Sequence, residues 1–135
     1  MNNFLVLPAF FAAIITTTAG EQCRLKGADV TVTSYHRSIL TGSNMDCNDI
    51  SKARNNAGDY CTLTSKLSKS GYRRSTPTSA EINGLLQGLG LQKMKTLHPT
   101  SYGCELLHES YPMFAGRHVN TFTLKCVYKY ATGFP

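Results

Sequence analysis

The sequence predicts a small α+β fold, a disulfide-stabilised sandwich in which an antiparallel sheet is packed by one or two helices. Three observations support this prediction. Residues 60–68 and 119–130 alternate between two sets of side chains, which is typical of half-buried strands. Residues 78–90 instead repeat leucine and isoleucine at helical spacing. All five cysteines follow residue 20, where they can form disulfides in an oxidising compartment.

The first segment is predicted to be a secretory signal peptide and not part of the fold. Residues 4–15 form an uncharged apolar run that is short for a bilayer span, and the small residues of TTTAG follow it. We therefore expect a signal peptide at residues 1–19, cleaved near Ala19 or Gly20, although MNNF supplies no Lys or Arg. A buried N-terminal helix and a membrane anchor are the alternatives. Residues 20–135 suit a single α+β domain.

The segment at residues 29–40 is expected to start as a strand. Its first half, DVTVTS, alternates and is rich in β-branched residues, whereas the continuation SYHRSIL is equally compatible with the start of a helix. A turn is expected at TGSN, residues 41–44. Residues 48–60 are expected to form a short polar helix or a loop, because NNAG makes a long helix unfavourable.

The middle of the chain is expected to contain a strand, a basic loop and the clearest helix. The strand covers residues 60–68 and the loop residues 69–78. Thr78 or Ser79 is the candidate N-cap of the helix, and Glu81 lies in its first turn. Gly88 and Gly90 are expected to end it, while Gly84 inside it costs about 1 kcal/mol relative to Ala.

The C-terminal part is expected to close the sheet. Residues 93–103 are predicted to form a strand followed by a loop, and residues 104–110 a short strand or one helical turn. The segment YPMFAGRH, residues 111–118, is expected to turn at Pro112 and Gly116. The terminal strand, residues 119–130, should face the core with its more apolar set, which comprises Asn120, Phe122, Leu124, Cys126, Tyr128 and Tyr130.

The cysteines indicate two disulfides and one additional thiol, and the pairing stays open at this point. The chain has no C-x-x-C and its histidines are scattered, so we expect no zinc site. It also has no glycine-rich phosphate loop, and we expect no cofactor. The disulfide candidates are Cys23, Cys47, Cys61, Cys104 and Cys126.

The formal net charge of +6 lies entirely after residue 20 and favours anionic partners. Phospholipid surfaces, nucleic acid, acidic glycans and the acidic mouth of a cation channel are all compatible with it. Basic residues gather along and after the strand at residues 60–68, with one tyrosine between them; a solvated charged face without a partner is the alternative. The candidate binding residues are Lys66, Lys69, Tyr72, Arg73 and Arg74, with Arg117 and His118 as neighbours if the terminal turn lies alongside.

An acid–base enzyme is the alternative function. Metal-free phosphodiester cleavage needs a base, an acid and a cation, and Glu105, Arg117 and one histidine supply these groups within a short segment. Secreted fungal guanyl-specific ribonucleases use such a set on a helix-plus-sheet fold. The spacing alone is a weak signal, so we assign no catalytic residues and favour a non-enzyme.

Gly103 and Cys104, followed by the run at residues 112–116, resemble the C-terminal segment of the killer protein 4 family, which comprises small secreted fungal killer toxins. Gly103 and Cys104 match a Gly-Cys pair of the family, and Cys23 matches a cysteine near the mature N-terminus. Asp46 and Tyr60 stand before the mid-chain cysteines, where family members carry a basic residue implicated in their effect on calcium channels. Further residues occur in the same order as in the family: Pro112, Met113, Phe114, Ala115, Gly116, Val119, Leu124 and Tyr128.

The resemblance implies a small sandwich whose last strand closes the sheet. It also implies a target at a cell surface, with an ion channel as one candidate. Together with the composition, it leads us to expect a secreted, basic, toxin-like or host-directed effector with a role in virulence. We expect it to bind a protein or anionic surface of another cell without catalysis. A ribonuclease-like protein that binds RNA, active or degenerate, is the second expectation.

Overall fold

The fold was described from a computed structural model, which describes residues 23–130; the expected signal peptide lies outside this range. Four strands form one mixed sheet in the order β2-β4-β5-β3. β5 (His118–Lys129) runs antiparallel to both of its neighbours, β3 (Tyr60–Gly71) and β4 (Ser101–Pro112). The short β2 (Asn44–Met45) pairs parallel with the start of β4. The expected α+β sandwich is confirmed, with one parallel pair added to the antiparallel sheet.

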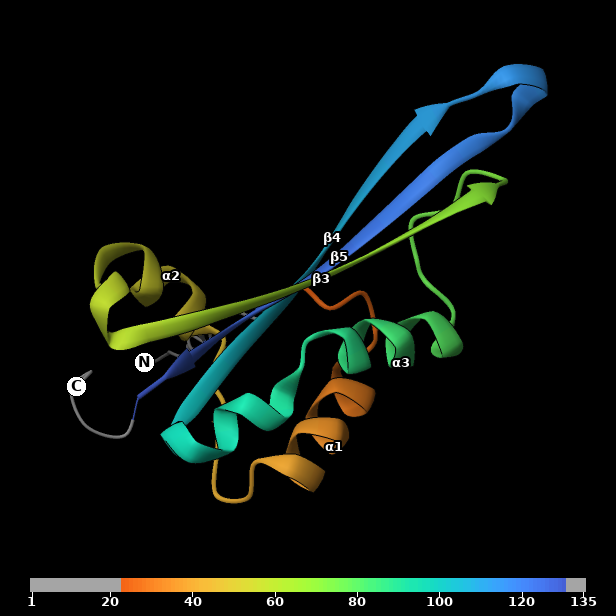
Figure 1. Cartoon of the computed structure of the whole chain (residues 1–135). Coiled ribbons are helices and arrows are strands. Elements are labelled where there is room, and N and C mark those ends of the chain that lie inside the picture. Colours follow the sequence, from red (N-terminus) through yellow and green to blue (C-terminus); the bar gives the residue numbers. More distant parts are fainter. Residues whose placement is uncertain (1–22, 131–135) are drawn as a thin grey trace, which may run out of the picture.

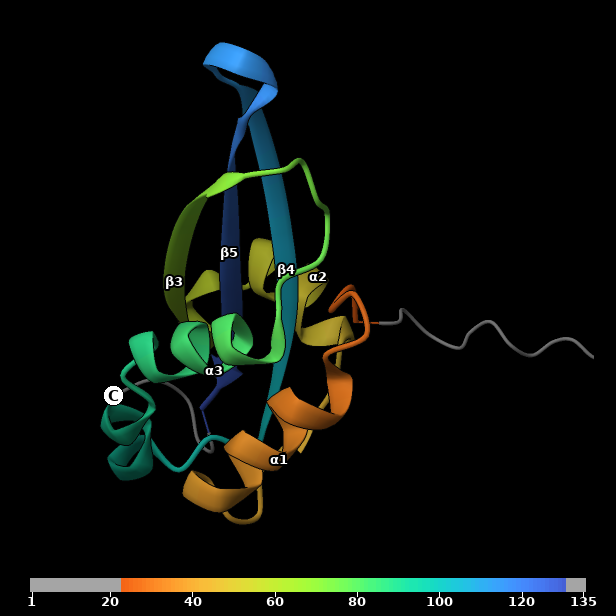
Figure 2. The same ribbon diagram turned by 90° about the vertical axis from the view of Figure 1, so that its right-hand side faces the viewer.

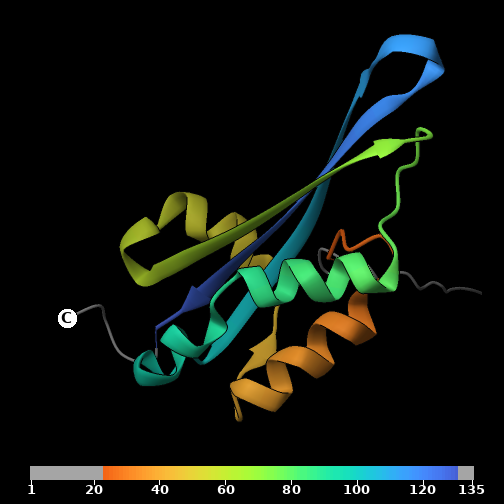
Figure 3. The same cartoon turned by 45° about the vertical axis from the view of Figure 1, so that its right-hand side comes forward.

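Helices cover both faces of the sheet (Figure 1). One face carries α1 (Asp29–Ile39), α3 (Ser79–Gly88) and the 3₁₀ helix η3 (Leu91–Leu97), and Figure 3 shows α1 and α3 next to each other there. The other face carries α2 (Asn48–Asn55), followed by a short 3₁₀ turn, η2 (Ala57–Asp59). We call these two sides of the sheet the α1/α3 face and the α2 face.

The expected strand at the start of residues 29–40 is wrong, because this segment forms the helix α1. Val32 and His36 are fully buried, one helical turn apart. Val30, which would share a face with Val32 in a strand, is exposed. Burial at a spacing of four residues outweighs the β-propensity of the valines and threonines. Asp29 in the first turn favours the helix N-terminus, and the Thr33 hydroxyl donates to the Asp29 carbonyl at 2.9 Å.

The expected strand at residues 93–103 is also wrong. Residues 91–97 form η3, in which Leu91 and Met94 are buried three residues apart, as the tight 3₁₀ repeat requires. The strand begins only at Ser101, after the buried Pro99, and it continues through the segment for which a short strand or one helical turn was expected. The sheet therefore has a longer β4 than the sequence predicted.

The predictions for α3 and β5 are confirmed. Thr78 caps α3, because its hydroxyl accepts from the Glu81 backbone N–H at 3.2 Å while the Glu81 carboxylate accepts from the Thr78 N–H at 2.9 Å. In β5, Phe122, Leu124 and Tyr128 are fully buried against the α1/α3 face, as the alternation predicted. The helix and the strand thus bring their apolar faces into one core.

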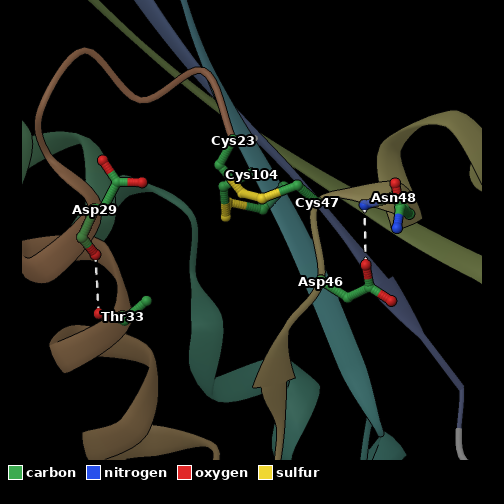
Figure 4. Close-up of a disulfide and its surroundings, with 8 residues drawn as sticks. Cys23, Asp29, Thr33, Asp46, Cys47, Asn48 and Cys104 are labelled. Carbon is green, nitrogen blue, oxygen red and sulfur yellow. Dashed lines mark hydrogen bonds between the residues drawn. A yellow bond between two sulfur atoms is a disulfide. The ribbon is translucent and has the colours of Figure 1, made fainter. Parts of the chain in front are cut away.

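Two disulfides stabilise the fold, which confirms the expected number. Cys104 and Cys126 stand directly opposite each other and join β4 to β5. Cys23 and Cys47 join the N-terminal segment to the residue before α2, and Figure 4 shows this bridge next to the strand that carries Cys104. Cys61 is the free thiol among the described residues.

The two halves of the sheet differ in what covers them. α2 packs over the half near Tyr60 and Gly103, where a side chain on Gly103 would lie 2.7 Å from the Asp46 carbonyl oxygen. The other half ends in the β4–β5 hairpin, which extends past the helices in both Figure 2 and Figure 3. We call this half, from Leu107 to Thr123 of the hairpin and from Lys66 to Arg74 of β3 and its loop, the distal end.

Candidate binding surface

The distal end brings together the residues that the sequence assigned to binding. In the β3–β5 register, Lys69 is opposite Asn120 and Gly71 is opposite His118. The loop that starts at Tyr72 therefore begins next to the hairpin residue Arg117, as the sequence analysis required for a common surface. We call this set the distal surface; it comprises Lys66, Lys69, Tyr72, Arg73, Arg117 and His118.

The two basic residues of β3 point to opposite faces of the sheet, and Lys69, expected in the loop, lies within the strand. Successive residues of a strand point to opposite faces, and directly opposed residues point to the same face. Lys69 pairs with Asn120, whose neighbours in the alternation face the core, so Lys69 belongs to the α1/α3 face. Lys66 pairs with Thr123 and belongs to the α2 face. The cations therefore lie on both faces of the distal end.

Arg74 is already engaged within the protein, although its side chain stays one-third exposed. Its guanidinium makes two hydrogen bonds of 2.7 Å to the Glu81 carboxylate at the start of α3. This bidentate contact lowers the pKa of Glu81 to about 2. The same guanidinium stacks over the Phe122 ring at 5.3 Å from its centre. Arg74 therefore holds the loop after β3 against α3 and β5.

Asn120 is a buried positioning residue that the sequence did not mark as functional. Its side-chain amide donates to the Tyr72 carbonyl at 2.8 Å, and its amide oxygen accepts from the Arg74 backbone N–H at 3.2 Å. These two bonds satisfy a backbone N–H and a backbone carbonyl of the loop that would otherwise need water as their partner. Asn120 thereby fixes the backbone on both sides of Arg73, whose side chain remains exposed.

The distal end also presents large apolar side chains, of which the sequence marked Tyr72 for binding and Met113 and Phe114 only as family motif residues. Phe114 is 91% exposed and Tyr72 is 90% exposed. Leu107, Tyr111 and Met113 are each about half exposed. The sequence signal for this exposed surface was the run of apolar residues between Pro112 and Gly116, because hairpin tips are normally polar.

The hairpin tip has a defined conformation. Ala115 and Gly116 both adopt left-handed backbone angles, with φ of 61° and 75°. The Met113 N–H donates to the Arg117 carbonyl at 2.6 Å and closes the turn. A left-handed alanine is uncommon and costs free energy, and the turn that contains it leaves the Phe114 side chain exposed.

The candidate catalytic residues are not brought together. Glu105 is opposite Lys125, which lies eight residues after Arg117 along β5, so about 26 Å separates the two positions at about 3.3 Å per residue. Glu105 also belongs to the α2 face, whereas His108 and His118 oppose Phe122 and Pro112 on the α1/α3 side. Glu105 instead lines a groove of about 910 Å³ with Arg24 and Arg54 at the other end of the sheet. The cleft that catalysis required is absent from this part of the described chain.

A buried histidine lies next to the β4–β5 disulfide. The ligand atoms of His36, Cys104 and Cys126 lie within 4.8 Å of one another, but the two sulfurs are bonded to each other. The His36 Nδ1 donates to the Val32 carbonyl at 2.8 Å, and its Nε2 accepts from the Tyr128 hydroxyl at 2.7 Å. Burial lowers the pKa of His36, which keeps the ring neutral in this arrangement. This group is therefore explained as part of the core.

Comparisons with known proteins gave no match: a scan against protein-family models, a search of curated proteins and a search of solved structures all found none. The resemblance to the killer protein 4 family therefore rests on its sequence motif. Among residues 23–130, no helix is both long and apolar enough to cross a bilayer.

Proposed function

We propose that the protein is a secreted, toxin-like or host-directed effector that binds an anionic target at the surface of another cell, without catalysis. The observation that carries this proposal is the β3–β5 register, which places the β3 loop beside the hairpin and gathers the distal surface. In the described part of the chain, the ion pair is Arg74–Glu81, and Lys66, Lys69, Arg73 and Arg117 make no salt bridge, although Lys69 is near enough to Glu81 to help lower its pKa.

Two further features support the proposal. Disulfides are typical of proteins that mature in an oxidising compartment, which fits the expected signal peptide. The separation of Glu105 from Arg117 and the distal histidines removes the geometric basis for cleavage, which favours binding alone. An ion channel is one candidate target within this proposal, because of the family resemblance.

The experiment is charge reversal on the distal surface. Lys69→Glu with Arg73→Glu should abolish most binding of the fluorescently labelled protein to protoplasts of fungal and plant cells, measured by flow cytometry. Arg74 is left unchanged because its loss would release the loop. Lys93→Glu with Lys95→Glu, both exposed on η3, is the control of equal charge change and should bind as the wild type does.

The proposal fails if the distal and control variants bind cells equally well while both keep the wild-type urea midpoint. RNA binding is the second candidate function, because the exposed Tyr72 next to Arg73 is the arrangement that stacks on an unpaired base. Filter binding of a short single-stranded RNA tests it, and loss of binding in Tyr72→Ala is the expected result.

A further inference from the structure

The apolar side chains of the distal end continue from the hairpin tip down one face of β4. Leu107, Glu109 and Tyr111 are two residues apart along β4 and oppose Thr123, Thr121 and Val119 of β5, so the three side chains share the α2 face, with Glu109 between the two larger groups. The contacts of α2 are with the other half of the sheet, near Gly103, and leave this strip exposed. The strip leads directly to Met113 and Phe114 in the tip.

Basic side chains lie beside the base of this apolar tip, on the side of β3. Arg117 ends the turn, and Arg73 and Lys69 lie across the β3–β5 pair from it. Glu109 is the carboxylate of the distal end; it accepts from the Tyr111 hydroxyl at 3.3 Å and keeps its negative charge, so these three cations stand against one anion there. Glu81, at the start of α3, is paired with Arg74. An apolar tip with cations next to its base matches the boundary of an anionic bilayer, where acyl chains lie under negatively charged headgroups.

The tip is also built to present these side chains without rearrangement. The turn is closed by the Met113–Arg117 hydrogen bond, and Asn120 and Arg74 hold the neighbouring loop. The hairpin extends past α1, α2 and α3, so a flat surface can reach the tip without contacting the helices (Figure 2). A preorganised surface loses little conformational entropy on binding.

We propose that the hairpin tip docks on an anionic phospholipid bilayer, with Phe114 and Met113 entering the interface and Lys69, Arg73 and Arg117 contacting lipid phosphates. This inference deepens the proposed function and rests on it, because it names the anionic target. Lipid is favoured over RNA because Leu107 and Met113 are not stacking groups, and they continue the apolar surface that Phe114 begins.

The absence of tryptophan from the sequence allows a direct test. Phe114→Trp places a single fluorescent reporter at the tip, and Val30→Trp places one at an exposed site on α1. On vesicles of phosphatidylcholine with about one-third phosphatidylserine, the emission of Phe114→Trp should shift to shorter wavelength while that of Val30→Trp stays constant. Vesicles of phosphatidylcholine alone should produce a much smaller change, because the attraction to anionic headgroups is missing.

Vesicle co-sedimentation gives the magnitudes. Phe114→Ser should lower the partition coefficient about tenfold or more, as expected for a large apolar side chain that no longer leaves water. Arg117→Glu should lower it by a similar factor, because one favourable cation is replaced by an anion. The control Lys93→Glu should change it less than twofold. Salt at about 1 M, where the screening length is about 3 Å, should release most of the protein.

Three outcomes overturn the inference. They are the absence of binding to anionic vesicles, equal spectral shifts for the two reporters, and binding that Phe114→Ser leaves unchanged. If the distal variants still lose cell binding while vesicles do not bind, the proposed function stands and the lipid target is wrong. If RNA binds with the same dependence on Phe114 and vesicles do not, the partner is nucleic acid.

Discussion

Removal of one hydroxyl from the core should reveal how much the buried histidine depends on it. In Tyr128→Phe, the ring that packs in β5 is retained, but the His36 Nε2 loses its 2.7 Å partner. Both residues are fully buried, so water cannot replace the bond. Leaving a buried acceptor unsatisfied costs about 1–3 kcal/mol. With an unfolding slope of about 2 kcal/mol per molar urea, the midpoint should fall by about 1 M.

The matched control is Tyr102→Phe. Tyr102 is also buried and stacks on His36, with ring centres 4.1 Å apart, but the imidazole nitrogens bond to Val32 and Tyr128. We expect a smaller decrease in the urea midpoint, measured by circular dichroism at pH 7.5. Equal losses in the two variants would refute the reasoning, because they would show that the hydrogen bond to His36 contributes nothing beyond loss of a tyrosine hydroxyl.

The remaining predictions concern pH, close packing and the thiol. Burial lowers the pKa of His36, so below the unfolded value of about 6.5 the unfolded chain binds a proton that the folded chain does not. Stability should therefore fall as the pH is lowered through 6.5, and a constant urea midpoint from pH 7.5 to 5 would contradict this effect of His36. A second loss of stability should follow between about pH 4.5 and 2, as Glu81 is protonated. Gly103→Ala should destabilise the fold by about 1–3 kcal/mol, because its Cβ would lie 2.7 Å from a backbone carbonyl oxygen. Gly84→Ala has open space around it in α3 and should stabilise the fold by about 0.5–1 kcal/mol. Chemical denaturation compares the two variants, and equal effects would argue against the close approach at Gly103. Non-reducing peptide mapping should recover the two disulfides, with alkylation after unfolding only at Cys61; a labelled cysteine elsewhere would disprove the pairing.

The sequence predicted those elements whose signals are local. The capping box at Thr78 and Glu81 and the alternation from Asn120 to Tyr128 both operate within a few residues, and both were confirmed. α1 was missed because its β-branched residues favour a strand locally, while the burial of Val32 and His36 comes from packing against distant strands. Pairing of the cysteines likewise depends on the β4–β5 register, which no spacing along the chain specifies.

The candidate surface was predicted in part. A cluster of basic residues is visible in the sequence, and the β3–β5 register then places Arg117 near it. The sequence could not show that Arg74 is held by Glu81, since this pair forms only when α3 docks beside β5. It also could not show that Phe114 remains exposed, because an apolar residue in a short turn is equally compatible with burial.

The disulfide between β4 and β5 keeps the two parts of the chain joined if a protease cuts the exposed hairpin. Cys104 and Cys126 enclose the whole segment that carries the tip, so a single peptide-bond cleavage near Phe114 would not separate the two parts of the chain. The nicked protein would stay covalently joined under oxidising conditions and would separate into two fragments only on reduction. A chain that presents an exposed aromatic residue to proteases can in this way be cut at its most exposed point and remain one molecule.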